Sequence, residues 1–76
     1  MSEQDFLEFR FEDSEYVRTA RVSRDVIQGL LISRMSMDRI IKATELVART
    51  VTPENQEEAN AGGSWAFITA TRKVSA

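Results

Sequence analysis

The sequence predicts an α+β fold: a small three-stranded sheet, antiparallel or mixed, with two helices packed on one of its faces, in the order ββααβ. Three observations carry this prediction. Residues 6–22 and 64–74 have the alternation or composition of strands, and two segments within residues 24–51 have helical periodicity, each preceded by a serine. Two helices on one face of a sheet are the two-layer arrangement that buries the apolar side of each element.

The first strand is expected in residues 6–12, FLEFRFE, which alternate between two faces as a half-buried strand does. The turn formers EDSE follow, with the tip of the turn expected near Asp13 and Ser14. Residues 16–22, YVRTARV, then continue with aromatic and β-branched side chains. Residues 6–22 are therefore expected to form a hairpin.

The register expected for this hairpin sets Phe11 opposite Tyr16. One face is then apolar apart from one arginine, and it contains Leu7, Phe9, Phe11, Tyr16, Arg18, Ala20 and Val22. The other face is mostly polar and contains Phe6, Glu8, Arg10, Val17, Thr19 and Arg21. A slip of one residue would exchange the two faces, so the assignment depends on the length of the turn.

Two helices are expected after the hairpin. Ser23 is suited to cap a helix that continues to about residue 34, with an apolar stripe on one side. Ser36 is suited to cap a second helix, whose apolar positions fall within about a third of a helical wheel as far as Val51.

Residues 53–63 allow two interpretations. Thr52 as a cap and Pro53 at the first helical position favour a short helix over residues 53–60. The segment has almost nothing to bury, however, and its acidic composition indicates a mobile connection to the last strand.

The last strand, expected from residue 64 to about 74, leaves open which of its faces is buried. Trp65 and Phe67 share one face, and Ala66, Ile68 and Ala70 share the other. Aromatic side chains are more often buried, which favours Trp65 and Phe67 in the core. In the opposite arrangement they join Phe6 in an exposed apolar patch of the kind that marks an interface.

Histidine and cysteine are both absent from the 76 residues. Their absence removes the commonest zinc ligands, the usual general base near neutral pH, and every disulfide or thiolate nucleophile. The carboxylates gather near the expected turn and in the acidic connection, where solvated charge is the ordinary explanation. We therefore expect a protein that is not an enzyme and that uses neither a metal nor a cofactor.

The net charge of −2 is unevenly distributed. Residues 1–15 hold six acids against one base, whereas residues 16–49 hold seven bases against three acids. The acidic start lacks the basic and apolar parts of a signal peptide, and no run approaches the roughly 20 apolar residues of a membrane span. We expect a single domain over residues 1–76, cytoplasmic and not bound to membranes. Because a chain this short leaves much of its surface exposed, we also expect a homodimer.

Arg18, Arg21 and Arg24 recur at every third position but do not form one basic patch. Arg18 and Arg21 are an odd number of residues apart on a strand and so point to opposite faces, and Arg24 belongs to the helix start. Arg18, on the apolar face, has two interpretations. Its methylenes cover Phe9 while its head reaches water, or its guanidinium anchors an anion.

The leading hypothesis is an interaction module that binds another protein through its sheet face or an edge strand. A small acidic chain also fits an inhibitor that occupies a nucleic-acid-binding surface of a larger complex. The alternative is a binder of nucleic acid or of a small anionic ligand, which the acidic start disfavours. The residues expected to carry either function are Phe6, Arg10, Arg18, Arg21, Trp65 and Phe67.

The order of elements resembles that of small stand-alone bacterial and phage proteins. No motif in the sequence is specific enough to name a family.

Overall fold

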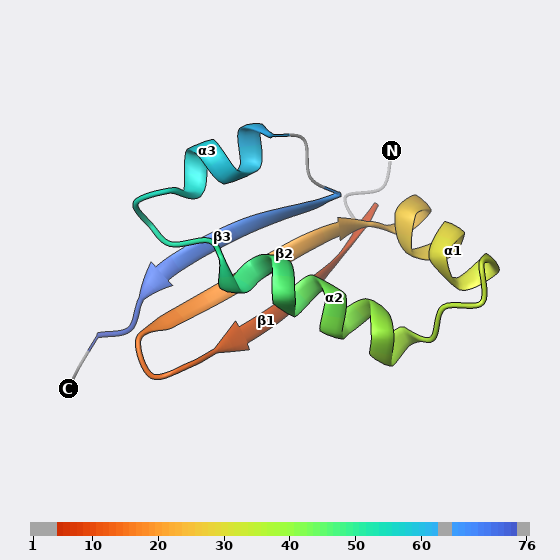
Figure 1. Cartoon of the computed structure of the whole chain (residues 1–76), viewed down its shortest axis with the longest axis horizontal. Coiled ribbons are helices and arrows are strands. Elements are labelled where there is room, and N and C mark those ends of the chain that lie inside the picture. The colour runs from red at the N-terminus through yellow and green to blue at the C-terminus, as the bar shows by residue number, and fades with distance from the viewer. Residues whose placement is uncertain (1–4, 63–64, 75–76) are drawn as a thin grey trace.

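The computed structural model describes residues 5–62 and 65–74, and its main elements follow the order ββααβ (Figure 1). The strands are β1 (Phe6–Glu12), β2 (Tyr16–Ser23) and β3 (Ala66–Arg72), and the helices are α1 (Arg24–Ile32), α2 (Met37–Arg49) and α3 (Gln56–Ala61). The sheet has the order β1-β2-β3 and is antiparallel throughout. The predicted α+β class and element order are confirmed. Residue 64, where the last strand is expected to begin, lies outside the described residues.

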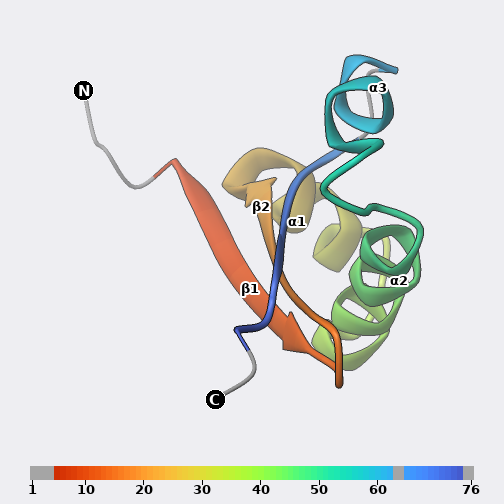
Figure 2. The same ribbon diagram turned by 90° about the vertical axis from the view of Figure 1, so that its left-hand side faces the viewer.

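The two longer helices lie on the same side of the sheet, whereas α3 lies near β3 (Figure 2). Burial along β2 and β3 alternates as a sheet with one covered face requires. The apolar core between the layers consists of Ala20, Val22, Ile27, Ile40, Ala48, Val51, Ala66, Ile68 and Ala70. In the part of the chain that the structure describes, no helix is long and apolar enough to cross a membrane.

The hairpin register differs from the predicted one by two residues, because Phe11 lies opposite Arg18 instead of Tyr16. The tip of the turn lies at Ser14 and Glu15, one residue later than expected. Asp13 Oδ1 accepts the backbone N–H groups of Glu15 at 2.8 Å and Tyr16 at 2.7 Å, and the Asp13 N–H donates to the Tyr16 carbonyl at 3.0 Å. A shift of two residues keeps every side chain on its predicted face.

Both serine caps are confirmed: the Ser23 hydroxyl accepts from Asp25 N–H, and the Ser36 hydroxyl accepts from Arg39 N–H. The end of α1 is a turn in which Arg34 has a φ of 69°. The N–H groups of Arg34 and Met35 donate to carbonyls in the last turn of the helix. In this type of helix end, glycine usually occupies the position with positive φ.

The third helix begins at Gln56 with Asn55 as its N-cap, so the predicted start at Pro53 is wrong. Thr52 instead belongs to a turn. Its N–H donates to Asn55 Oδ1 at 2.7 Å, and its hydroxyl accepts the Asn55 N–H at 3.3 Å. These two hydrogen bonds hold residues 52–55 in a turn, and the helix begins only after it, at Gln56.

The side-chain amides of α3 bind the backbone of β3 along its outer edge. Asn60 Nδ2 donates to the Ile68 carbonyl at 2.7 Å, and Asn60 Oδ1 accepts the Ile68 N–H at 2.9 Å. Gln56 Oε1 accepts the Ala70 N–H at 2.9 Å. The amides thus take the place of a neighbouring strand. The mobility expected for residues 53–63 stays a prediction, and these hydrogen bonds would restrain it.

The last strand buries its small side chains and not its aromatic ones, contrary to the favoured arrangement. Ala66, Ile68 and Ala70 lie in the core, and Phe67 is 55% exposed on the opposite face. Ile68 and the buried side chains of β2 pack in one core with residues of α1 and α2, between the sheet and the helices.

Candidate protein-binding surface

The face of the sheet opposite α1 and α2, called the outer face below, is not covered by either of these helices (Figure 2). The short helix α3 lies at its β3 edge, where Gln56, Glu57, Asn60 and Ala61 line a pocket of about 300 Å³ with Phe67. Phe6 begins this face on β1, and the strand registers align the remaining positions in three rows across the sheet. The rows are Glu8, Arg21 and Phe67; Arg10, Thr19 and Thr69; and Glu12, Val17 and Thr71.

One end of the outer face carries two exposed aromatic rings on either side of an arginine. The Arg21 guanidinium lies over the Phe6 ring, 4.7 Å from its centroid, and Arg21 is also directly opposite Phe67 on β3. Phe6 is 36% exposed and Phe67 is 55% exposed. Arg21 Nε donates to Glu8 Oε2 at 3.4 Å. Phe6, Arg21 and Phe67 therefore form one amphipathic group, called the Phe–Arg–Phe cluster below.

The remaining cations described on the outer face share one carboxylate, that of Glu12. Arg10 Nε lies 3.1 Å from Glu12 Oε2, and Lys73 Nζ lies 3.3 Å from the other oxygen of the same carboxylate. The hydrogen bond from Lys73, together with the charge of Arg10, lowers the pKa of Glu12. Each arginine on this face thus has a carboxylate beside it, and with Lys73 the cations of this surface exceed its carboxylates, Glu8 and Glu12, by one.

Arg18 does not lie on this surface. It points into the helix-covered side, where it is only 6% exposed, and its Nε donates to the Val51 carbonyl at 2.8 Å. Its Nη1 donates to Asp13 Oδ2 at 2.7 Å, and its guanidinium stacks 4.7 Å from the Tyr16 ring centroid. The predicted head group in water is wrong, because the guanidinium is buried and joins the hairpin turn to the chain just after α2. The role as an anchor for an external anion stays a prediction.

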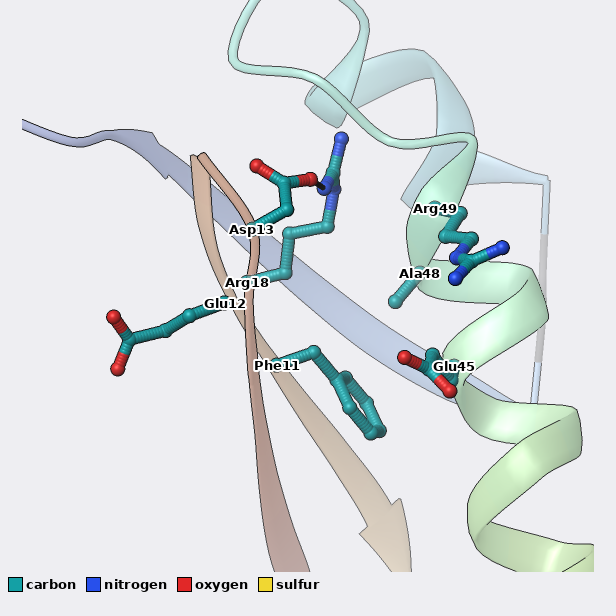
Figure 3. Close-up of a pocket in the computed structure, with 7 residues that line it drawn as sticks. All are labelled: Phe11, Glu12, Asp13, Arg18, Glu45, Ala48 and Arg49. Carbon is teal, nitrogen blue, oxygen red and sulfur yellow. Dashed lines mark hydrogen bonds and ion pairs between the residues drawn. The ribbon is translucent and has the colours of Figure 1, made fainter. Parts of the chain in front are cut away.

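The space beside Arg18 is a pocket of about 70 Å³ between the hairpin and α2 (Figure 3). Ligand sites for small molecules usually have volumes of about 300–1,000 Å³. Three carboxylates line this pocket beside two guanidiniums, so it has no excess of positive charge to hold an anion; the charged lining residues are Glu12, Asp13, Arg18, Glu45 and Arg49. Backbone N–H groups of Tyr16 and Glu15, with the Arg18 guanidinium, lower the pKa of Asp13 to about 2, so Asp13 is ionised near neutral pH.

Trp65 precedes β3 and does not share the position of Phe67. It lies 36% exposed at the helix side, in an apolar pocket of about 360 Å³ that is lined by Val26, Leu30, Met35, Ile40, Ala43 and Trp65. The alternation of side chains between two faces applies within β3, which begins at Ala66. It therefore does not place Trp65 on the same face as Phe67. This correction removes the indole from the outer face.

Four of the six predicted site residues, Phe6, Arg10, Arg21 and Phe67, therefore share the outer face, and Arg18 and Trp65 do not. Sequence reasoning missed the role of the α3 amides. Gln56 and Asn60 are four residues apart, a spacing that places both amides on one side of a helix, and this was the available signal.

The described residues contain no group of three or more carboxylates arranged to hold a metal ion. No protein-family model matches the sequence, and neither a curated protein nor a solved structure matches it.

Proposed function

We propose that this protein is a non-enzymatic interaction module that binds another protein through the outer face of its sheet. The observation that carries the proposal is the Phe–Arg–Phe cluster on the face that α1 and α2 do not cover. Aromatic and arginine side chains are the residues that most often dominate binding energy when a partner removes them from water. The threonines and paired charges around the cluster supply the polar rim that such interfaces have.

The alternative, binding of nucleic acid or of a small anion, has weaker support. Phosphate binding draws its affinity from cations that neutralise the backbone. Arg10 and Arg21 each lie beside a carboxylate of their own chain, and Arg18 is buried. The two rings predicted to stack on bases do not share a surface, because Trp65 lies on the helix side of the sheet and Phe67 on the outer face. A protein partner therefore fits this surface better.

Affinity capture with the purified chain as bait, from the cells that produce it, tests the proposal. We expect a protein that the wild-type bait retains and that Phe67→Ser and Arg21→Ser baits lose. Leu46→Ser is the matched control, since Leu46 is an exposed apolar residue on α2. Loss of the same protein with the control, or its retention by both outer-face variants, would contradict a role for this surface.

A binding titration with mixed-sequence single-stranded nucleic acid separates the two functions. The proposed module shows no binding that falls steeply with salt. Tight binding with a steep salt dependence, lost in Arg10→Ser and Arg21→Ser, would establish the alternative.

The source among bacteria or phages, the cytoplasmic location and a role as an inhibitor of a nucleic-acid-processing complex extend this proposal. The captured protein would test the last of these directly.

A further inference from the structure

The two edges of the sheet differ in how their backbone groups are satisfied. On β3, the N–H groups of Ile68 and Ala70 and the carbonyl of Ile68 are bonded by the amides of α3. On β1, no strand or helix of the described residues pairs with the outer side, and β1 is the other end of the sheet. Unpaired strand edges bind further strands unless they are covered. The edge of β1 is thus the one to which a strand can be added.

The hydrogen-bond pattern shows which groups face this edge. The Arg24 N–H donates to the Asp5 carbonyl at 2.9 Å, and the Asp13 N–H donates to the Tyr16 carbonyl at 3.0 Å. In an antiparallel ladder, alternate residues bond to the same neighbour, so the odd-numbered residues of β1 bond to β2. The N–H and carbonyl groups that face outward are those of Phe6, Glu8, Arg10 and Glu12.

We propose that a second copy of this chain adds to this edge, with the two β1 strands antiparallel and Phe9 opposite Phe9 of the second copy. In that register Glu8 lies opposite the second copy's Arg10, and Arg10 lies opposite its Glu8. Both residues direct their backbone groups outward, so each of these pairs exchanges two hydrogen bonds. The opposite charges also lie on the same face, where directly opposed residues attract.

Other registers fail for stated reasons. A shift of one residue sets the outward backbone groups of one β1 strand opposite residues of the second copy's β1 whose backbone groups already bond to β2. Pairing centred on Glu8 or on Arg10 opposes like charges, which destabilises a strand pair. Pairing centred on Leu7 or on Phe11 leaves much of each strand outside the ladder. The register centred on Phe9 joins all seven residues of β1 without a directly opposed like-charge pair.

Apolar burial favours the same arrangement. Leu7, Phe9 and Phe11 lie on the helix side of β1 but are only partly buried against the core. The two-fold axis of this pairing is perpendicular to the sheet, so the helices of both copies lie on one side. The apolar side chains of the two β1 strands then meet each other on that side, and the two outer faces form one continuous surface.

Light scattering coupled to size-exclusion chromatography tests the inference with the purified chain alone, independently of any captured partner. At high micromolar concentration we expect a mass of twice 8.6 kDa. A mass of 8.6 kDa for the wild-type chain would overturn the proposal. So would a dimer that Arg10→Glu leaves unchanged.

Charge reversal tests the register itself. In each of the variants Arg10→Glu and Glu8→Arg, residues 8 and 10 carry like charges, and the two-fold symmetry opposes them twice. We expect each variant to weaken dimerisation by about tenfold or more. Mixing the two variants opposes unlike charges again and restores a dimer. Arg39→Glu, an exposed charge reversal on α2, is the matched control and should remain dimeric. Circular dichroism confirms that each variant is folded. A mixture that stays monomeric would refute this register.

Discussion

Replacing Arg18 by methionine tests whether this buried arginine supports the fold. The change keeps a long side chain but removes the guanidinium that donates to the buried Val51 carbonyl at 2.8 Å. Leaving a buried carbonyl without a donor costs about 1–3 kcal/mol. Loss of the stacking on Tyr16 adds about 0.5–1 kcal/mol. Methionine recovers part of the packing of the arginine stem, so we expect a net loss of about 2–3 kcal/mol.

Urea denaturation followed by circular dichroism measures this loss, with thermal unfolding as a second readout. For a domain of this size the expected loss corresponds to a fall in Tm of about 10–20 °C. Arg21→Met is the matched control, because its side chain is 55% exposed on the outer face, and its stability should change by about 0.5 kcal/mol or less. Arg18→Lys should fall between the wild type and Arg18→Met, since one ammonium cannot reproduce the planar pair of donors.

A stability of Arg18→Met within about 0.5 kcal/mol of the wild type would refute the structural role of Arg18, as would equal losses for both methionine variants. The result also matters for binding experiments. If Arg18 supports the fold, loss of a partner in an Arg18 variant reports unfolding and not a lost contact.

Three further outcomes are expected. Because the pKa of Asp13 is lowered to about 2 from its ordinary 3.8, its contribution to stability is complete above pH 3.8 and is lost as the pH falls toward 2. Thermal unfolding from pH 5 to 2 should therefore show the advantage of the wild type over Asp13→Asn disappearing in that window. Asn60→Ala should accelerate hydrogen exchange of the Ile68 amide, measured by NMR, and unchanged exchange would refute the role of the α3 amide. Arg34→Gly should raise the free energy of unfolding by about 0.5–1 kcal/mol in urea titrations, because Arg34 has a positive φ; a loss of stability would contradict this.

The alternation of β1 and β2 was enough to predict which side chains share a face, even though the register was wrong. The error lay in the turn, where Asp13 accepts two backbone N–H groups and closes the hairpin on Ser14 and Glu15. Because the shift was even, Phe6, Arg10 and Arg21 still lie on the outer face. Local alternation therefore fixes faces more firmly than it fixes which residues oppose each other.

The last strand is ambiguous because each of its faces carries a large apolar side chain, Phe67 on one and Ile68 on the other. The choice depends on which face the helices cover, and this follows from contacts between segments far apart in the chain. Trp65 does not share a face with Phe67 for a related reason. It precedes the strand, so strand periodicity says nothing about its direction, and its neighbours come from α1 and α2.

The difference between the sheet edges follows from where the chain places its amides. Gln56 and Asn60 can reach the edge of β3 because α3 precedes that strand in the chain, whereas among the described residues no helix supplies side chains to the edge of β1. The backbone of β1 is left with alternating charges, Glu8, Arg10 and Glu12, which hinder pairing with an arbitrary strand. The same alternation is self-complementary about Phe9. The charges that hinder pairing with other strands thus favour pairing with a second copy of β1, because their order along the strand sets Glu8 opposite Arg10.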